Sequence, residues 1–403
     1  MKKNAFTYGL FILFFVYSCS AKENRNVFVE SRNEDLVLAS QELQLTNQQI
    51  TESRQNAITR TVQNASPAIV GINVTEIKQV VYSNPFLDDP FFRRFFGENF
   101  GRTTREYKVQ GLGSGFIISP DGYILTNHHV AGNATKIVVT MTDGMRYDAE
   151  IIGSDMVSDV ALLKINAENL PYLKLGNSDD IITGEWVIAF GNPFGLFSLN
   201  ARPTVTVGVV SNYGINFLHQ DEPFNRIYRN MIQTDAAISS GNSGGPLLNA
   251  LGEVIGMNTI IYSTATNRQG AGSIGIGFSI PINRVKKIVE LLKSKKELDR
   301  NFYTGIDARE IDEGIQRYLG ISEQSGVVVF GYQSNSPADK AGIKLGDIII
   351  AVDGEKVSKL DDYLIYINDA FVGDKKELTI IRDGKEIKRT ITLEKSLGRR
   401  SGR

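Results

Sequence analysis

A serine lies at the centre of a glycine-rich stretch, Gly241-Asn242-Ser243-Gly244-Gly245, between two runs that are typical of buried strands. A serine hydroxyl is a weak nucleophile near neutral pH, so it needs a base to take its proton and donors to hold the oxyanion that its attack creates. Because glycine leaves the backbone uncovered, the N–H groups of Gly241, Asn242 and Ser243 can converge on one point. We therefore predict that Ser243 is a nucleophile and that these three residues form its oxyanion hole.

The base must come from the three histidines of the chain. His128 and His129 stand where a strand-like run ends, whereas His219 stands in a polar stretch that we expect to be a loop. Asp159 directly precedes the apolar run 160–163, where its carboxylate can be shielded from water and can orient an imidazole. The order His, Asp, Ser is that of two-barrel chymotrypsin-like proteases, and it excludes an α/β-hydrolase, in which the serine comes first.

Four segments, taken in order, resemble the HtrA (Deg) family of exported serine proteases: "TNHHV", "SDVALLKI", "GNPFGL" and "GNSGGPL". The similarity extends over residues 57–393. It implies that His129 is the general base, that Asp159 orients it and that Ser243 is the nucleophile. It also implies that the backbone of Gly241 and Ser243 holds the oxyanion.

The same resemblance bears on substrate choice and on assembly. Ile238 and Ile261 match positions that line the primary specificity pocket of family members, which implies a small, apolar residue before the cleaved bond. His128 stands where the family more often has an asparagine. A trimer formed through the β domains is also implied.

The elements that must position these residues are short strands. Runs such as "AIVGINV", "VALLKI" and "TVTVGVVSN" are rich in valine and isoleucine and are separated by Gly, Asp and Asn turns. Apolar residues at helical spacing from Ile282 to Leu292 predict a helix that closes this region. We therefore predict a mainly β fold, with a two-barrel chymotrypsin-like protease domain over residues 57–295.

A smaller α+β domain is predicted over residues 302–395. The stretch "SNSPADKAGIKLGDIIIAVDGEKV" matches the middle of bacterial PDZ domains, and we expect one such domain. "FYTGIDAREI" resembles their carboxylate-binding loop, which places Tyr303, Thr304, Gly305 and Ile306 in that loop. Backbone N–H groups near Gly305 can hold a terminal carboxylate while the adjoining strand edge pairs with an extended peptide.

The two ends of the chain are predicted to lie outside these domains. Residues 1–21 combine a charged start, an apolar run and small residues, as in a secretory signal. Cys19, the only cysteine, either begins a lipid-modified mature chain, as in a lipobox, or is an incidental residue of an ordinary cleavage site. Residues 22–56 are predicted to be a polar linker and residues 396–403 a basic tail.

An aromatic segment interrupts the strand pattern at residues 83–110. Its phenylalanine pairs are separated by arginines and flanked by proline and glycine, so we predict a long loop rather than a strand. Clustered phenylalanines on a loop favour a protein contact. We expect this loop to touch another subunit or to cover the catalytic cleft.

Charge and residue counts exclude several other classes of function. A net charge of -1 gives no basis for nucleic-acid binding, which needs a clustered basic face. One cysteine and three histidines lack the spacing of a zinc site, so neither metal nor cofactor is expected.

We predict that the protein is an ATP-independent serine endopeptidase of the periplasm or cell envelope. We expect it to degrade misfolded or damaged exported proteins and the PDZ domain to control its activity. Its expected partners are unfolded polypeptides, their C-termini and further copies of the chain in a homotrimer or larger assembly, with a lipid tether to a membrane if Cys19 is modified. Two alternatives stay open. One is a stress-sensor protease that cleaves a specific membrane protein, and the other is a peptide-binding chaperone with secondary proteolysis.

Overall fold

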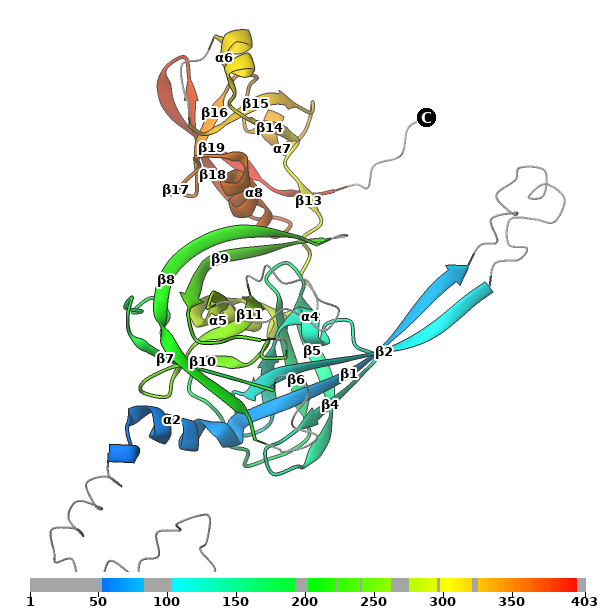
Figure 1. The fold of residues 1–403 in the computed structure, drawn as a ribbon. Coiled ribbons are helices and arrows are strands. Elements are labelled where there is room, and N and C mark those ends of the chain that lie inside the picture. The colour runs from blue at the N-terminus through cyan, green and yellow to red at the C-terminus, as the bar shows by residue number, and fades with distance from the viewer. Residues whose placement is uncertain are drawn as a thin grey trace, which may run out of the picture. The chain divides into compact units, whose positions relative to one another are not determined.

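The computed structural model describes residues 53–82, 103–192, 202–221, 224–239, 241–261, 275–295, 298–320 and 325–396. The chain divides into two compact units, residues 1–54 and 55–403, and the fold below is that of the second unit (Figure 1). The predicted signal, Cys19, most of the polar linker and most of the basic tail lie outside the described residues.

The first barrel is a closed sheet of six strands in the order β1-β2-β3-β6-β5-β4. The strands are β1 (Ile69–Tyr82), β2 (Thr103–Ile117), β3 (Tyr123–Thr126), β4 (Lys136–Thr140), β5 (Arg146–Asp155) and β6 (Val160–Ile165). Every residue of β6 except Lys164 is buried, which explains why this segment is a nearly continuous apolar run.

The second barrel repeats this architecture with strands in the order β10-β11-β12-β9-β8-β7. They are β7 (Trp186–Gly191), β8 (Thr204–Asp221), β9 (Phe224–Thr234), β10 (Pro246–Asn249), β11 (Val254–Ile261) and β12 (Gly277–Pro281). His219, which we expected in a loop, lies in β8 opposite Arg226 of β9, because the two long strands continue their pairing to Asp221 and Phe224. The mainly β, two-barrel fold is therefore confirmed.

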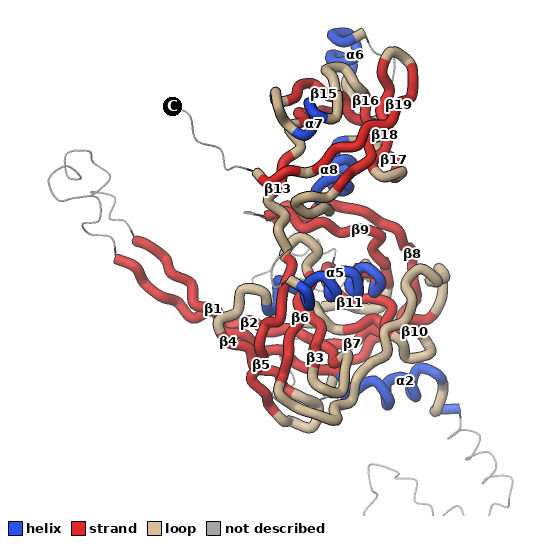
Figure 2. Tube along the Cα trace, turned by 180° about the vertical axis from the view of Figure 1, so that it is seen from behind, coloured by secondary structure: helices blue, strands red, loops and turns tan. Residues whose placement is uncertain are grey.

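Among the described residues of the barrel region, helices are few and mostly short (Figure 2). They are α2 (Ala57–Ala65), the 3-10 helix η2 (Ser66–Ala68), α4 (His128–Ala131) and α5 (Ile282–Ser294). The side chain of Asn56 caps α2 by accepting the N–H of Thr59 at 2.9 Å. Helix α5 is the one predicted from apolar spacing, and it buries Ile282, Val285, Ile288, Val289 and Leu292.

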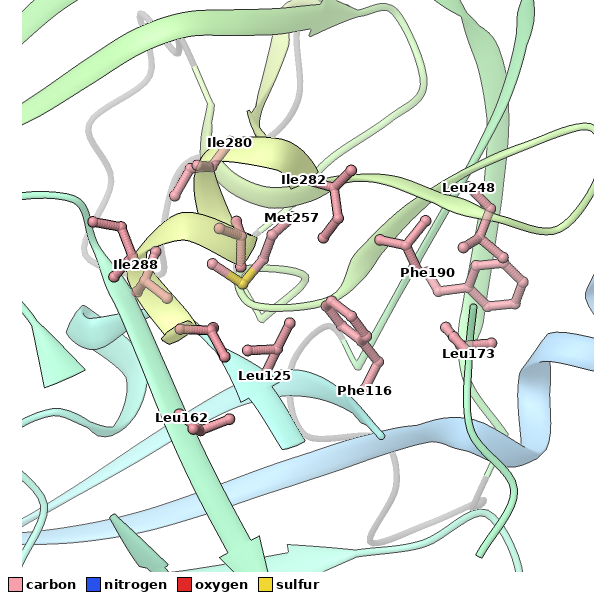
Figure 3. Packing of buried hydrophobic residues seen from close by; sticks show 14 of the residues in the cluster. Phe116, Leu125, Leu162, Leu173, Phe190, Leu248, Met257, Ile280, Ile282 and Ile288 are labelled. Carbon is pink, nitrogen blue, oxygen red and sulfur yellow. The ribbon is translucent and has the colours of Figure 1, made fainter. Parts of the chain in front are cut away.

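One hydrophobic cluster joins the two barrels and α5 (Figure 3). Phe116 and Leu162 come from the first barrel, Phe190 and Met257 from the second, and Ile288 from the helix. Burying a side chain of this size contributes about 1.5–3 kcal/mol. Since side chains of both barrels share this cluster, it fixes the junction at which residues from the two barrels can meet.

The predicted loop over residues 83–110 is shorter than expected. Residues 103–110 belong to β2 and pair with residues 75–82 of β1, with Gln110 opposite Thr75 and Thr103 opposite Tyr82. Figure 1 shows the two strands extending together beyond the barrel. A run of paired backbone groups favours this ribbon although its side chains are largely polar. The phenylalanine pairs themselves lie outside the described residues.

The C-terminal part is a small α+β domain, as predicted. Its elements are β13 (Phe302–Tyr303), β14 (Ile306–Glu310), α6 (Glu313–Leu319), β15 (Val327–Tyr332), α7 (Pro337–Lys340), β16 (Ile348–Val352), β17 (Glu355–Lys356), α8 (Leu360–Asn368), β18 (Lys375–Arg382), β19 (Lys385–Thr392) and β20 (Glu394–Lys395). Strand β14 begins the sheet order β14-β15-β16-β18-β19. In the described part of the chain, no helix is both long and apolar enough to cross a membrane.

Candidate active site

His129 and Asp159 meet in the first barrel, as the order of residues predicted. His129 lies on the single turn of α4 that follows β3, and Asp159 directly precedes β6, the strand that pairs with β3. The imidazole Nδ1 lies 2.8 Å from Oδ2 and 3.0 Å from Oδ1 of the carboxylate. The backbone N–H of His129 also donates to Oδ1 at 3.0 Å. The carboxylate thus fixes the ring and leaves Nε2 as the outward nitrogen.

Asp159 is fully buried, and both barrels supply its partners. The hydroxyl of Thr259 donates to Oδ2 at 2.7 Å and that of Tyr228 at 3.2 Å, while Nε of Arg226 lies 3.9 Å from Oδ1. Burial alone would raise the pKa of Asp159, but His129, Thr259 and Arg226 together hold the pKa below its ordinary value. The carboxylate is therefore ionised at neutral pH.

The backbone of Asp159 is left-handed, with φ of 58°. Few residues other than glycine adopt this conformation, although aspartate and asparagine tolerate it better than most. The amide of Asn127 holds the position by donating to the carbonyl of Asp159 at 2.9 Å. Local strain is therefore part of how the carboxylate is aimed at the imidazole.

Ser243 lies across the junction from His129. Both line a cleft of about 410 Å³, together with Gly111, Leu112 and Gly241. The Ser243 hydroxyl donates to the carbonyl of Thr259 at 2.9 Å, and among the described residues no hydrogen bond joins it to His129. Rotation about the Cα–Cβ bond would redirect the hydroxyl, and such contacts often tighten only when substrate is bound.

The glycines around Ser243 are required by space as well as by conformation. Gly244 has φ of 84°, and a side chain there would meet the carbonyl of Ser114 at 2.2 Å. A side chain on Gly245 would meet the carbonyl of Phe190 at 2.1 Å. These contacts explain why the loop is rich in glycine: its backbone packs directly against both barrels.

The structure separates the two adjacent histidines. His128 is 6% exposed, and neither of its ring nitrogens has a hydrogen-bond partner among the described residues. Burial lowers the pKa of His128, so the ring is neutral near pH 7. Its ring lies against Gly132, where an added side chain would be 2.1 Å from Nδ1. Only His129 contacts the carboxylate.

We expect the wild type to lose stability on acidification more steeply than the variant His128→Asn. The folded pKa of His128 lies below its unfolded value of about 6.5, so the unfolded state takes up the proton first and stability falls as the pH drops through that value. Thermal unfolding of both proteins between about pH 7.5 and about pH 5.5 measures this. Parallel slopes for the two proteins would contradict it.

The predicted specificity residues are placed in part. Ile238 is 1% exposed, and its Cδ1 lies 2.7 Å from where a side chain on Gly277 would begin. Gly277 is the strand partner of Ile261 at the end of β11. The side chain of Ile261 lies outside what the structure describes. The Ile261 position therefore lies one strand away from the backbone of Gly277, against which Ile238 packs.

The residues of this site that were missed in the sequence include Thr259 and Tyr228, which contact Asp159, and Ser114, which contacts Gly241. Thr259 stands in the apolar run of β11, and a polar residue in a buried strand was the available signal. No comparable signal marked Tyr228 or Ser114, whose partners Asp159 and Gly241 lie 69 and 127 positions away in the sequence.

Comparison with protein-family models defines the class: a trypsin-like peptidase domain matches residues 113–257, and a PDZ domain matches residues 303–393. A curated relative, the probable periplasmic serine endoprotease DegP-like of Chlamydia pneumoniae, is 41% identical over 82% of this chain and 67% of its own length. The putative serine protease HhoA of Synechocystis sp. is 39% identical over 82% of both chains. This chain belongs to the HtrA family of trypsin-like serine endoproteases.

Solved structures agree with this assignment. The HtrA-type protease AlgW with a decapeptide matches with a TM-score of 0.60 and 34% identity, over 83% of this chain and 97% of that chain. A serine endoprotease from Yersinia pestis matches with a TM-score of 0.54 and 30% identity, over 83% and 97% of the two chains. The chain spans less of its other chlamydial relatives, covering 61% of the DegP-like protein of Chlamydia trachomatis.

Proposed function

We propose that this chain is an ATP-independent serine endopeptidase of the cell envelope that degrades misfolded or damaged exported proteins. The observation that carries the proposal is the convergence of His129, Asp159 and Ser243 at the junction of the barrels, beside the glycine-rich loop 241–245. Labelling by a fluorophosphonate probe and digestion of unfolded casein test it. A pure, folded chain that neither labels nor digests casein would refute it.

Each residue then has a chemical role. Nε2 of His129 takes the proton of the Ser243 hydroxyl as its oxygen attacks the carbonyl carbon of the peptide bond. Asp159 accepts the Nδ1 hydrogen and stabilises the imidazolium. The N–H groups of Gly241 and Ser243 hold the oxyanion. The imidazolium then protonates the leaving amine, and Nε2 activates the water that hydrolyses the acyl-enzyme.

The specificity pocket is assigned to Ile238 and Ile261. Ile238 packs against Gly277 and so makes the proposed pocket shallow, which favours a small, apolar residue before the cleaved bond. Mass-spectrometric mapping of the cuts in casein tests this assignment. Cleavage mainly after basic or aromatic residues would contradict it.

The peptide-binding groove is assigned to the PDZ domain. A groove of about 720 Å³ runs along β14 and α8 and is lined by Tyr303, Thr304, Gly305 and Ile306, together with residues of α8. Gly305 has φ of 77°, and a side chain there would collide with Ser336 at 2.3 Å. An edge strand beside a glycine-containing turn fits an extended peptide ending in a carboxylate.

The variant Gly305→Ala is expected to weaken binding of a C-terminal peptide by at least about tenfold, because the left-handed backbone and the contact with Ser336 both oppose a side chain. Fluorescence anisotropy of a labelled peptide measures the affinity. Gly354→Ala is the matched control, since Gly354 has φ of 82° in an open hairpin with no atom within 4 Å of an added side chain. Equal affinities of the two variants would contradict the assignment.

Control of proteolysis by the PDZ domain is supported by a charged contact. Asp369 follows α8, which lines the groove, and accepts two hydrogen bonds from Arg284 of α5 at 2.6 and 2.7 Å. Arg229 of β9 lies 3.4 Å from the same carboxylate. Arg300 lies 3.6 Å from it and also donates to Asp155, which ends β5, at 2.8 Å. A ligand that moves α8 would therefore disturb strands close to the catalytic residues.

A stress-sensor protease is the second candidate, and the orientation of the Ser243 hydroxyl toward Thr259 favours it. A sensor would rest in such an inactive arrangement until a C-terminal peptide binds. Casein digestion with and without an activating peptide separates the two functions. Rapid digestion without peptide supports general degradation, whereas digestion only with peptide supports the sensor.

We propose that the mature chain resides in the periplasm, in keeping with the names of its relatives, as a homotrimer tethered by lipid on Cys19. Intact-mass analysis of the protein purified from cells tests the lipid, and light scattering tests the trimer. A mature mass without an acyl chain would contradict the tether. A monomer at all concentrations would contradict the assembly.

A further inference from the structure

Ser114 of β2 makes three hydrogen bonds to the second barrel. It is fully buried, and its hydroxyl donates to the carbonyl of Gly241 at 2.6 Å while accepting the N–H of Asn192 at 2.7 Å. Its own backbone N–H donates to the carbonyl of Ser243 at 3.0 Å. One residue of the first barrel therefore holds the first and third residues of the segment 241–243 and Asn192, which follows β7.

The segment needs such support because glycine rotates freely. Gly241 has φ of 94°, a conformation open to glycine at little cost, and its neighbouring peptide units could turn with small energy changes. The peptide unit between Gly241 and Asn242 is held at both ends. Its carbonyl accepts the Ser114 hydroxyl, and its N–H, that of Asn242, donates to the carbonyl of Ser239 at 2.9 Å. The prediction that the Asn242 N–H converges with those of Gly241 and Ser243 is therefore wrong, because a carbonyl of the same loop already accepts it.

We propose that Ser114 is a positioning residue of the oxyanion hole, which fixes where the N–H groups of Gly241 and Ser243 point. The inference rests on the proposed serine protease function. Ser114 lies beneath the loop and acts through Gly241. Its hydroxyl both donates to the Gly241 carbonyl and accepts the Asn192 N–H, so it ties these two backbone groups together.

Loss of the Ser114 hydroxyl is expected to raise the free energy of the transition state. The oxyanion forms only as Ser243 attacks, so a displaced donor lowers kcat while the ground-state binding of substrate, and with it KM, changes little. Removing a donor outright costs about 10²–10³ in kcat. The variant Ser114→Ala keeps both donors and only loosens them, so we expect a fall in kcat of about tenfold to about a hundredfold.

The experiment measures kcat and KM with a fluorogenic peptide, and the affinity for a peptide aldehyde whose adduct places an oxyanion in the hole. S114A is compared with Ser178→Ala. Ser178 is also a buried serine, and its hydroxyl accepts the backbone N–H of Asn283 at 3.1 Å, but Ser178 lies between β6 and β7 and its partner lies at the start of α5. Ser114→Cys keeps nearly the same volume with a weak donor and serves if the alanine variant does not fold.

The expected result is a lower kcat and weaker aldehyde binding for S114A and S114C, with an unchanged KM and with S178A equal to the wild type. A kcat for either folded variant within about twofold of the wild type, or a loss carried by KM alone, would overturn the role of Ser114 and leave the protease function standing. A wild type that neither cleaves nor labels would contradict both.

Discussion

The variant Ser243→Ala is expected to lower kcat by about six orders of magnitude, because the described residues that line the cleft include no other hydroxyl or thiol to form the acyl-enzyme. The residual rate above the uncatalysed reaction would come from substrate binding and the oxyanion hole. Fluorogenic peptide cleavage, with casein as a second substrate, measures the loss. The fluorophosphonate label should disappear at the same time.

The fold should survive this change. The Ser243 hydroxyl makes one hydrogen bond, to the carbonyl of Thr259, and a bond of this kind contributes about 1 kcal/mol. Thermal unfolding and peptide binding by the PDZ groove are therefore the controls, and both should match the wild type. If S243A still digested casein above the level without enzyme, the assignment of the nucleophile would be wrong.

Replacing Asp159 with asparagine is expected to lower kcat by about four orders of magnitude. Asparagine tolerates the left-handed backbone at this position and has nearly the same shape, so the loss is one of charge and of hydrogen-bond direction. An amide N–H facing Nδ1 would favour the tautomer that carries its hydrogen on Nε2, where the base must be free. The pH profile of kcat/KM and the rate of fluorophosphonate labelling measure the effect.

The same variant has a consequence for stability. The lowered pKa of Asp159 means that its carboxylate stabilises the fold above about pH 4 and that this contribution is lost as the pH falls through the folded pKa. Asp159→Asn should remove that part of the acid sensitivity. Asp148→Asn, an exposed position of β5, is the control for a lost negative charge. Equal activity of D159N and D148N would rule out the proposed role of Asp159.

Much of the fold followed from local patterns. Valine-rich and isoleucine-rich runs predicted the strands, apolar spacing predicted α5, and the Asp353-Gly354 and Asp383-Gly384 pairs mark hairpins in which all four residues have positive φ. Such signals depend on neighbours in the chain. Residues 103–110 were misassigned because the partner strand β1, rather than their own composition, makes them a strand.

In the candidate site, too, local sequence signals predicted some residues and contacts distant in the sequence brought in the others. We predicted His129, Asp159 and Ser243 because each lies in a short motif and the three occur in the order His, Asp, Ser. Thr259 and Tyr228 were missed, since each contacts Asp159 across a separation of dozens of residues, at 100 and 69 positions respectively. The orientation of the Ser243 hydroxyl could not be predicted either, because it depends on a backbone carbonyl of β11.

The carboxylate of Asp159 belongs to the first barrel by sequence, but two of its hydrogen bonds come from Thr259 and Tyr228 of the second barrel. A molecule whose halves have folded but not yet docked would leave that charge without Thr259 and Tyr228, and would keep Ser243 away from its base. Under the proposed function, peptide cleavage therefore requires the two barrels to be docked, and not merely folded one by one.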